Sequence, residues 1–248
     1  MEFFDRIIRD TATLLSPYTP RTWRYRSEAA RKESSPNELV LARDSAFVLG
    51  GGNRPALTYS CTTTDGSLIG SDEILLYGAD LSEIKSDLPF ARIVMVKIAD
   101  IGDLKAEGGG EDAAYKAVKD IEFVKYKVFP EGYMIRAGAL DFREQVRVSK
   151  KAQAEGISFE SVGAAFIRKY KENPLVEAAR VIFIAGEFPL FKDLAENARK
   201  TADTAKALSH VIKTMKTDCR ACNLKPICDE VEGMRELHFK AAGPSLRS

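Results

Sequence analysis

Short runs of apolar and β-branched residues, each bounded by turn-forming residues, most constrain what this chain can fold into. Their lengths suit strands, and turns such as Gly50–Asn53 and Asp65-Gly66 separate them. The pattern predicts extended segments at Ala46–Leu49, Leu57–Thr63, Glu73–Tyr77, Ala91–Ile98, Tyr133–Ala137, Val146–Ser149 and Arg180–Ala185. The last of these is almost wholly apolar, which is typical of a strand covered on both faces.

Apolar residues at helical spacing predict helices before, between and after these strands. Met1–Leu15 has an amphipathic pattern, and Ser158 is placed to cap a helix with one apolar stripe. Further helices are expected at Glu111–Lys127 and Pro189–Met215. Because helices and strands do not alternate strictly, the predicted fold class is α+β, with one mixed α/β-sheet domain and packed helices.

The length of 248 residues suits one large domain with appendages. We expect an N-terminal helix and basic linker at residues 1–38, an α+β domain at 39–215, and a cysteine-rich metal-binding segment at 216–248. The linker prediction rests on Pro17, Pro20 and Pro36, which lie among an excess of arginine and lysine.

The net charge and the hydropathy of the chain limit the kinds of partner that we expect it to bind. The 37 basic and 36 acidic residues leave a net charge of +1, so no overall field attracts nucleic acid. No apolar run reaches the roughly 18 residues that a membrane-spanning helix needs. Asp5, Arg6 and Arg9 interrupt the N-terminal apolar stretch, which argues against a secretory signal. We therefore expect a cytoplasmic protein that binds neither nucleic acid nor membrane.

Three of the four cysteines form the strongest chemical motif, because Cys219, Cys222 and Cys228 have C-x2-C-x5-C spacing. A C-x2-C loop can bring two thiolates to one metal centre, and the third cysteine can return to it. In a reducing compartment such clustering favours a metal over a disulfide. The spacing suits a [4Fe–4S] cluster or zinc, and the fourth ligand is open between Cys61, His238 and an exogenous group.

Two further motifs accompany these cysteines in the sequence, a predicted glycine turn and the basic end of a predicted strand. Gly51-Gly52-Asn53-Arg54 follows a predicted strand and precedes Pro55, and Leu88-Pro89-Phe90 precedes another strand. Between residues 146 and 166, Arg147-Val148-Ser149-Lys150 is followed in order by Gly156, Phe159 and Gly163. Over about residues 39–228 this set resembles the middle domain of the acetyl-CoA synthase subunit of the carbon monoxide dehydrogenase/acetyl-CoA synthase complex.

The resemblance implies a role for each cysteine of the motif. Cys219 and Cys222 match the pair that begins the family's [4Fe–4S] site, and Cys228 stands in place of a third ligand at a closer spacing. The family's fourth cubane cysteine, and the Cys-Gly-Cys motif that holds its distal nickel, have no counterpart in this sequence. A complete CO-methylating acetyl-CoA synthase activity is therefore not expected from this chain alone.

The resemblance also implies a function in anaerobic one-carbon metabolism. We expect an iron–sulfur protein that serves as a docking or accessory module for a corrinoid methyl carrier, such as a corrinoid iron–sulfur protein. The alternative is a zinc-stapled interaction module without catalysis, in which the metal only folds the C-terminal segment.

Arg147 and Lys150 are candidate ligands for the phosphates of coenzyme A, because a basic pair at a strand end can hold phosphate. The alternatives are surface charges or a partnership with Glu144. Gly50–Arg54 is expected to be a tight turn rather than a phosphate loop, since no Gly-Lys-Ser/Thr sequence follows it.

Overall fold

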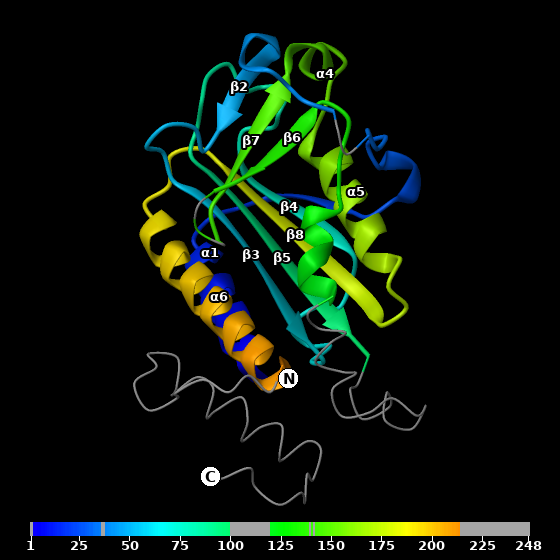
Figure 1. Ribbon diagram of the computed structural model, residues 1–248, viewed down its shortest axis with the longest axis vertical. Helices are drawn as coiled ribbons and strands as arrows, with labels where there is room; N and C mark the ends of the chain where they lie inside the picture. Colours follow the sequence, from blue (N-terminus) through cyan, green and yellow to red (C-terminus); the bar gives the residue numbers. More distant parts are fainter. Residues whose placement is uncertain (1, 36–37, 100–119, 139, 141, 214–248) are drawn as a thin grey trace, which may run out of the picture.

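The longest strand, β8 (Val176–Ala185), lies at the centre of a five-stranded sheet with the order β1-β4-β8-β5-β3 (Figure 1). The computed structural model describes residues 2–35, 38–99, 120–138, 140 and 142–213. β8 is parallel to β4 (Glu73–Gly78) and antiparallel to β5 (Phe90–Ile98). β3 (Ala56–Thr63) runs parallel to β5 at one edge. The predicted strand at Arg180–Ala185 is confirmed, and its end is buried as expected.

Helices cover both faces of this main sheet. Ser60 of β3 contacts Tyr170 of α5 (Phe159–Lys171), whereas its neighbour Cys61 contacts Thr201 of α6 (Phe191–Lys213). Adjacent residues of a strand point to opposite faces, so α5 and α6 lie on opposite sides. The predicted N-terminal helix is confirmed as α1 (Glu2–Leu15), which lies beside α6 (Figure 1).

A second sheet contains β2 (Ser45–Leu49), β7 (Glu144–Ser149) and β6 (Tyr133–Ala137) in the antiparallel order β2-β7-β6. In β7, buried and half-buried residues alternate, so one face of this sheet packs against the rest of the protein. The fold is therefore a mixed α/β fold with helices and two sheets, which confirms the predicted mixed α/β domain with packed helices. The strands were predictable from local patterns, but their division between sheets depends on contacts between distant segments.

Short helices and turns connect these strands, and two helices, α4 and α5, begin with a side-chain capping interaction. The Ser158 hydroxyl accepts a hydrogen bond from Ser161 N at the start of α5, as the sequence predicted. Ser149 caps α4 (Lys150–Ala154) in the same way. The described part of the helix predicted at Glu111–Lys127 is helical at 120–123. The remaining short elements are η1 (Ser27–Ala29), η2 (Ala42–Asp44) and η3 (Val124–Tyr126).

The predicted basic linker contains a strand, which corrects the expectation for this segment. β1 (Arg21–Arg24) pairs antiparallel with β4 at the edge of the main sheet, and Trp23 lies opposite Ile74. The basic residues that suggested a solvated segment form ion pairs, including Arg21 with Glu83 at 2.6 Å and Arg26 with Glu160 at 2.8 Å. The excess of basic residues therefore gave no indication of this strand. Acidic side chains from distant segments of the chain pair with these basic residues.

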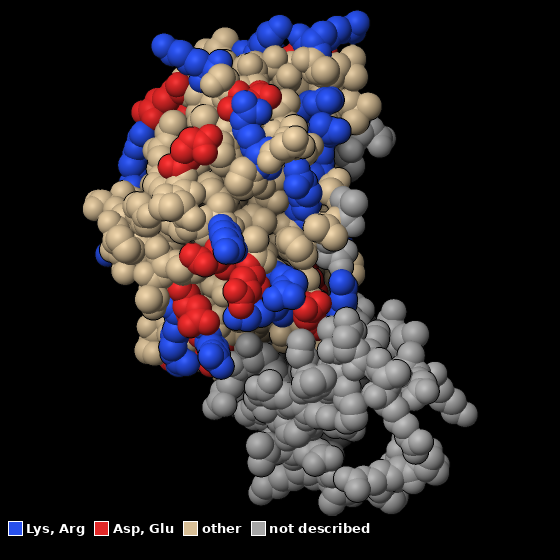
Figure 2. Space-filling model, turned by 90° about the vertical axis from the view of Figure 1, so that its left-hand side faces the viewer, with Lys and Arg blue, Asp and Glu red and all other residues tan. Residues whose placement is uncertain are grey.

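Acidic and basic side chains lie side by side on the lower part of the described surface that carries α6 (Figure 2), so neither sign of charge predominates there. Glu196 and Lys200, for example, pair at 2.9 Å along this helix. Among the described helices, none combines the length and the apolar character that crossing a bilayer requires.

Candidate functional site

The predicted metal ligands Cys219, Cys222 and Cys228 lie outside the described residues, as does His238. Within the ranges that the structure describes, no group of three or more His, Cys, Asp or Glu side chains could hold a metal ion. The metal site therefore stays a prediction. α6, which precedes the cysteines in the sequence, is fixed on the main sheet through buried Leu194, Ala198 and Ala207.

Cys61, the candidate fourth ligand, occupies a fully buried position on β3. Its sulfur lies 3.8 Å from the Thr201 hydroxyl of α6. Burial raises the pKa of the Cys61 thiol to about 12, so the neutral thiol predominates near neutral pH. A metal ligand must be a thiolate, and here the side chain fills space between β3 and α6 instead. In the described structure, Cys61 is thus a core residue.

The structure brings Arg147 and Lys150 to one segment, which precedes β2. Arg147 of β7 donates a hydrogen bond to the Val40 carbonyl at 3.3 Å, and Lys150 at the start of α4 donates to the Arg43 carbonyl at 2.8 Å. Both side chains therefore hold residues 40–43 against the second sheet. Lys150 is exposed, whereas Nε of Arg147 is buried without a hydrogen-bond partner among the described residues. Their binding of coenzyme A phosphates stays a prediction.

Glu144, the alternative partner considered for this basic pair, forms a buried ion pair with Arg92 of β5. Arg92 Nε lies 2.8 Å from Glu144 Oε1, and both side chains are closed to solvent. The Arg92 guanidinium also lies 4.3 Å from the centre of the Phe166 ring. Burial by itself lowers the pKa of Arg92, but the Glu144 carboxylate outweighs this effect and raises it. The pair thereby keeps its charges and joins the two sheets.

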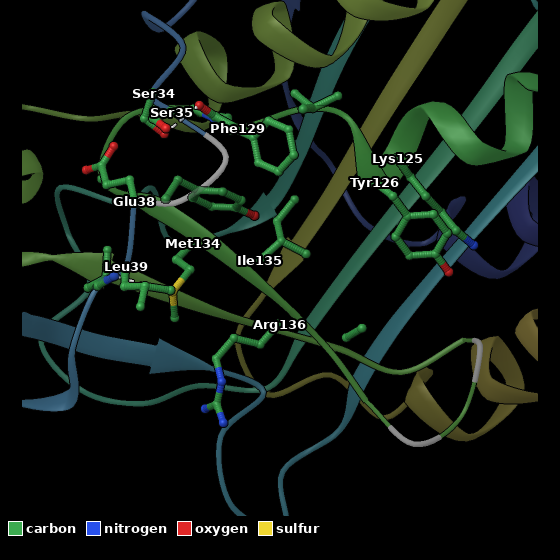
Figure 3. A pocket seen from close by; sticks show the side chains of 16 residues that line it. Ser34, Ser35, Glu38, Leu39, Lys125, Tyr126, Phe129, Met134, Ile135 and Arg136 are labelled. Carbon is green, nitrogen blue, oxygen red and sulfur yellow. Dashed lines mark hydrogen bonds between the residues drawn. The ribbon is translucent and has the colours of Figure 1, made fainter.

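A cavity of about 390 Å³ lies beside β6 and was not anticipated from the sequence (Figure 3). Glu38 and Leu39 lie on one side of it, Lys125 and Tyr126 lie on the other, and Ile135 lies between (Figure 3). The cavity was not predictable from sequence because its wall joins three residues of the predicted linker, Ser34, Ser35 and Glu38, with residues 39–40 and 125–137. The one local signal was the apolar run at residues 39–41, which directly follows the predicted linker and supplies Leu39 and Val40 to the wall.

The glycine turn at Gly50–Arg54 is a turn, as predicted. Gly50 and Gly52 have φ angles of 66° and 63°, and the chain then enters β3 rather than a helix. Arg143 donates to the Gly52 carbonyl at 3.1 Å.

No protein-family model matches this chain, and no curated protein is significantly similar to it.

Proposed function

We propose that this chain is a cytoplasmic iron–sulfur accessory protein of anaerobic one-carbon metabolism. In this proposal Cys219, Cys222 and Cys228 bind a [4Fe–4S] cluster, and the folded α/β part docks a corrinoid methyl carrier. The observation that carries the proposal is the C-x2-C-x5-C spacing in a chain with only four cysteines. Its resemblance to the acetyl-CoA synthase middle domain favours iron–sulfur over zinc.

Two features of the described residues support a division of roles. Cys61, the one cysteine among the described residues, is buried in the core, so the three clustered thiols are the ones that the proposal assigns to a metal. α6 is held on the sheet by its own buried residues, so it needs no metal for its packing. The cluster is thus an addition to a domain that has its own core.

Metal content tests the proposal directly. We expect protein purified without oxygen to be brown, to absorb near 400 nm and to contain about four iron atoms per chain. Cys222→Ser should lose most of the iron, whereas Cys61→Ser should retain it as the matched control. Stoichiometric zinc without iron, in protein made under iron-replete anaerobic conditions, would contradict the cluster and support the zinc-stapled module.

Coenzyme A binding is a separate part of the proposal. Titration calorimetry with coenzyme A should show binding that weakens when Lys150 is replaced by Gln, because a phosphate contact is lost. Lys151→Gln is the matched control, since Lys151 is the exposed neighbour of Lys150 and was not assigned to the site. Equal affinity of the two variants would remove Lys150 from the site.

The docking role requires a complex with a corrinoid iron–sulfur protein. We expect sedimentation or titration to show this complex with the metal-loaded chain, and we expect Arg147→Glu and Lys150→Glu to weaken it, because charges at an interface rim govern encounter. Circular dichroism of both variants must first match the parent, since these side chains also hold residues 40–43. Failure of the parent chain to bind any corrinoid protein would favour the zinc-stapled module.

A further inference from the structure

The cavity beside β6 follows the free edge of a sheet. All five residues of β6, Tyr133–Ala137, line it. Their side chains alternate between the two faces of the sheet, so a cavity that touches each of them lies along the strand's edge. β7 covers the other edge of β6, and within the described part of the chain no strand covers this one.

The backbone groups of Ile135 and Ala137 point toward this edge. Hydrogen-bonded pairs alternate along an antiparallel ladder. Ser149 N donates to the Gly132 carbonyl, and Gly138 N donates to the Arg143 carbonyl, so the residues bonded to β7 are the even-numbered ones. The N–H and C=O groups of Ile135 and Ala137 therefore face away from β7. No hydrogen bond to another described residue uses them.

The walls of the cavity combine apolar surface with three charged side chains, Glu38, Arg136 and Lys125, of which Lys125 is buried and pairs with Glu122. Leu39 is 70% exposed and Tyr126 is 45% exposed, which is unusual for large apolar side chains. Glu38 and Arg136 are also exposed, and neither forms an ion pair with a described residue. An occupant with apolar side chains, one base and one acid would match this surface.

We propose that this groove binds an extended segment of a partner protein, which adds to β6 as a further strand. Main-chain hydrogen bonds to Ile135 and Ala137 supply the affinity of such binding, and side-chain pockets supply its specificity. The segment carries apolar residues at alternate positions, a basic residue near Glu38 and an acidic residue near Arg136. Residues 38–39 and 125–126 wall the cavity on opposite sides, which favours a single extended segment over the edge of a second folded copy.

The probe is a set of peptides selected from a displayed library of random decapeptides. The complete metal-loaded protein serves as the bait in this selection. We expect the selected peptides to alternate apolar and polar residues. Binding should slow hydrogen exchange at the amides of Ile135 and Ala137, and leave the already bonded amides of Met134 and Arg136 unchanged.

Ala137→Pro removes the N–H that faces the groove, and it removes no hydrogen bond to β7. We expect this variant to bind the peptides about tenfold more weakly, whereas Ala137→Ser, which keeps the N–H, should bind as the parent does. Charge reversal of Arg136 to Glu should select for a basic residue at the matching peptide position. The cysteine variants should bind normally, so this test is independent of the metal.

Three results would overturn the inference: no enriched peptides, equal binding by Ala137→Pro and the parent, or protection of amides outside β6. Self-association of the parent protein that Ala137→Pro abolishes would instead identify a second copy as the occupant.

Discussion

Arg92 and Glu144 show how single residues hold this fold together. The two side chains come from different sheets, are closed to solvent, and are joined by two hydrogen bonds. Removing one partner of a buried pair leaves an uncompensated charge, and this is far more costly than removing both. The pair therefore joins the two sheets in a specific relative position, whereas its net contribution to the free energy of unfolding is small.

Replacing Glu144 by Leu should lower the free energy of unfolding by about 3–5 kcal/mol, since it leaves the Arg92 charge buried and unpaired. The double variant Arg92→Met/Glu144→Leu should recover most of this loss. Arg21→Met, which breaks an exposed pair with Glu83, should cost at most about 1 kcal/mol. Urea unfolding measures all three, and a double variant no more stable than the single one would refute the argument.

Glu83 provides a pH-dependent interaction at the surface. Its hydrogen bonds with Arg21 and with the Asp80 N–H lower the pKa of the Glu83 carboxyl to about 2 from an ordinary value of 4.5. A lowered folded-state pKa contributes stability above pH 4.5, and this contribution is lost as the pH falls toward 2. In Arg21→Gln the pKa of Glu83 should move toward its ordinary value, which carboxyl NMR titration measures. An unchanged pKa would show that Arg21 is not its cause.

Cys61 should not react with thiol reagents in the folded protein. With Cys219, Cys222 and Cys228 replaced by Ser, we expect a thiol reagent at pH 8 to modify no cysteine until urea is added, because burial raises the pKa of Cys61 to about 12. One thiol should then react. Rapid reaction without urea would mean that β3 and α6 separate readily.

Helix α5 illustrates how packing overrides propensity at the scale of an element. Gly163 lies inside this helix, where Ala would ordinarily be more stable by about 1 kcal/mol. A Cβ atom at this position would lie 2.8 Å from two side-chain carbons of Ile74 and 3.2 Å from Phe183. Glycine thus lets α5 approach β4 and β8 closely.

Gly163→Ala should therefore destabilise the protein by about 1–3 kcal/mol despite its higher helix propensity, because overpacking displaces Ile74 and Phe183. Thermal unfolding followed by circular dichroism measures the change. Gly163→Ala should cost less in an Ile74→Ala background, because that substitution removes both of the crowded carbons, Cγ1 and Cγ2. A more stable Gly163→Ala variant would show that the sheet can shift without cost.

At the scale of the whole molecule, the folded part should be stable without the metal. Among the described residues, one core extends from α1 through both sheets to α6, and these residues precede the cysteine motif. Replacing Cys219, Cys222 and Cys228 by Ser should therefore change the main unfolding transition by less than about 4 °C, or roughly 1 kcal/mol. A loss of cooperative unfolding would instead show that the metal supports the core.

For most elements apart from β1, the sequence by itself indicated which segments become strands and helices. Local patterns are sufficient for β3, β5, β8 and the capped start of α5, because alternation, apolar runs and an N-cap serine act within a few residues. The spacing of Cys219, Cys222 and Cys228 is also a local property, so a metal site can be predicted from it without coordinates.

Only the tertiary structure decided which partners the polar side chains and backbone groups contact. Arg147 and Lys150 donate hydrogen bonds to main-chain carbonyls, and Glu144 pairs with Arg92. β1 forms within the predicted linker by pairing with β4. None of these contacts was predictable locally, because each joins segments that are far apart in the sequence. The open edge of β6 is likewise a consequence of strand order. Pairing partners, burial and edges arise only when the chain has closed on itself, so no local pattern encodes them.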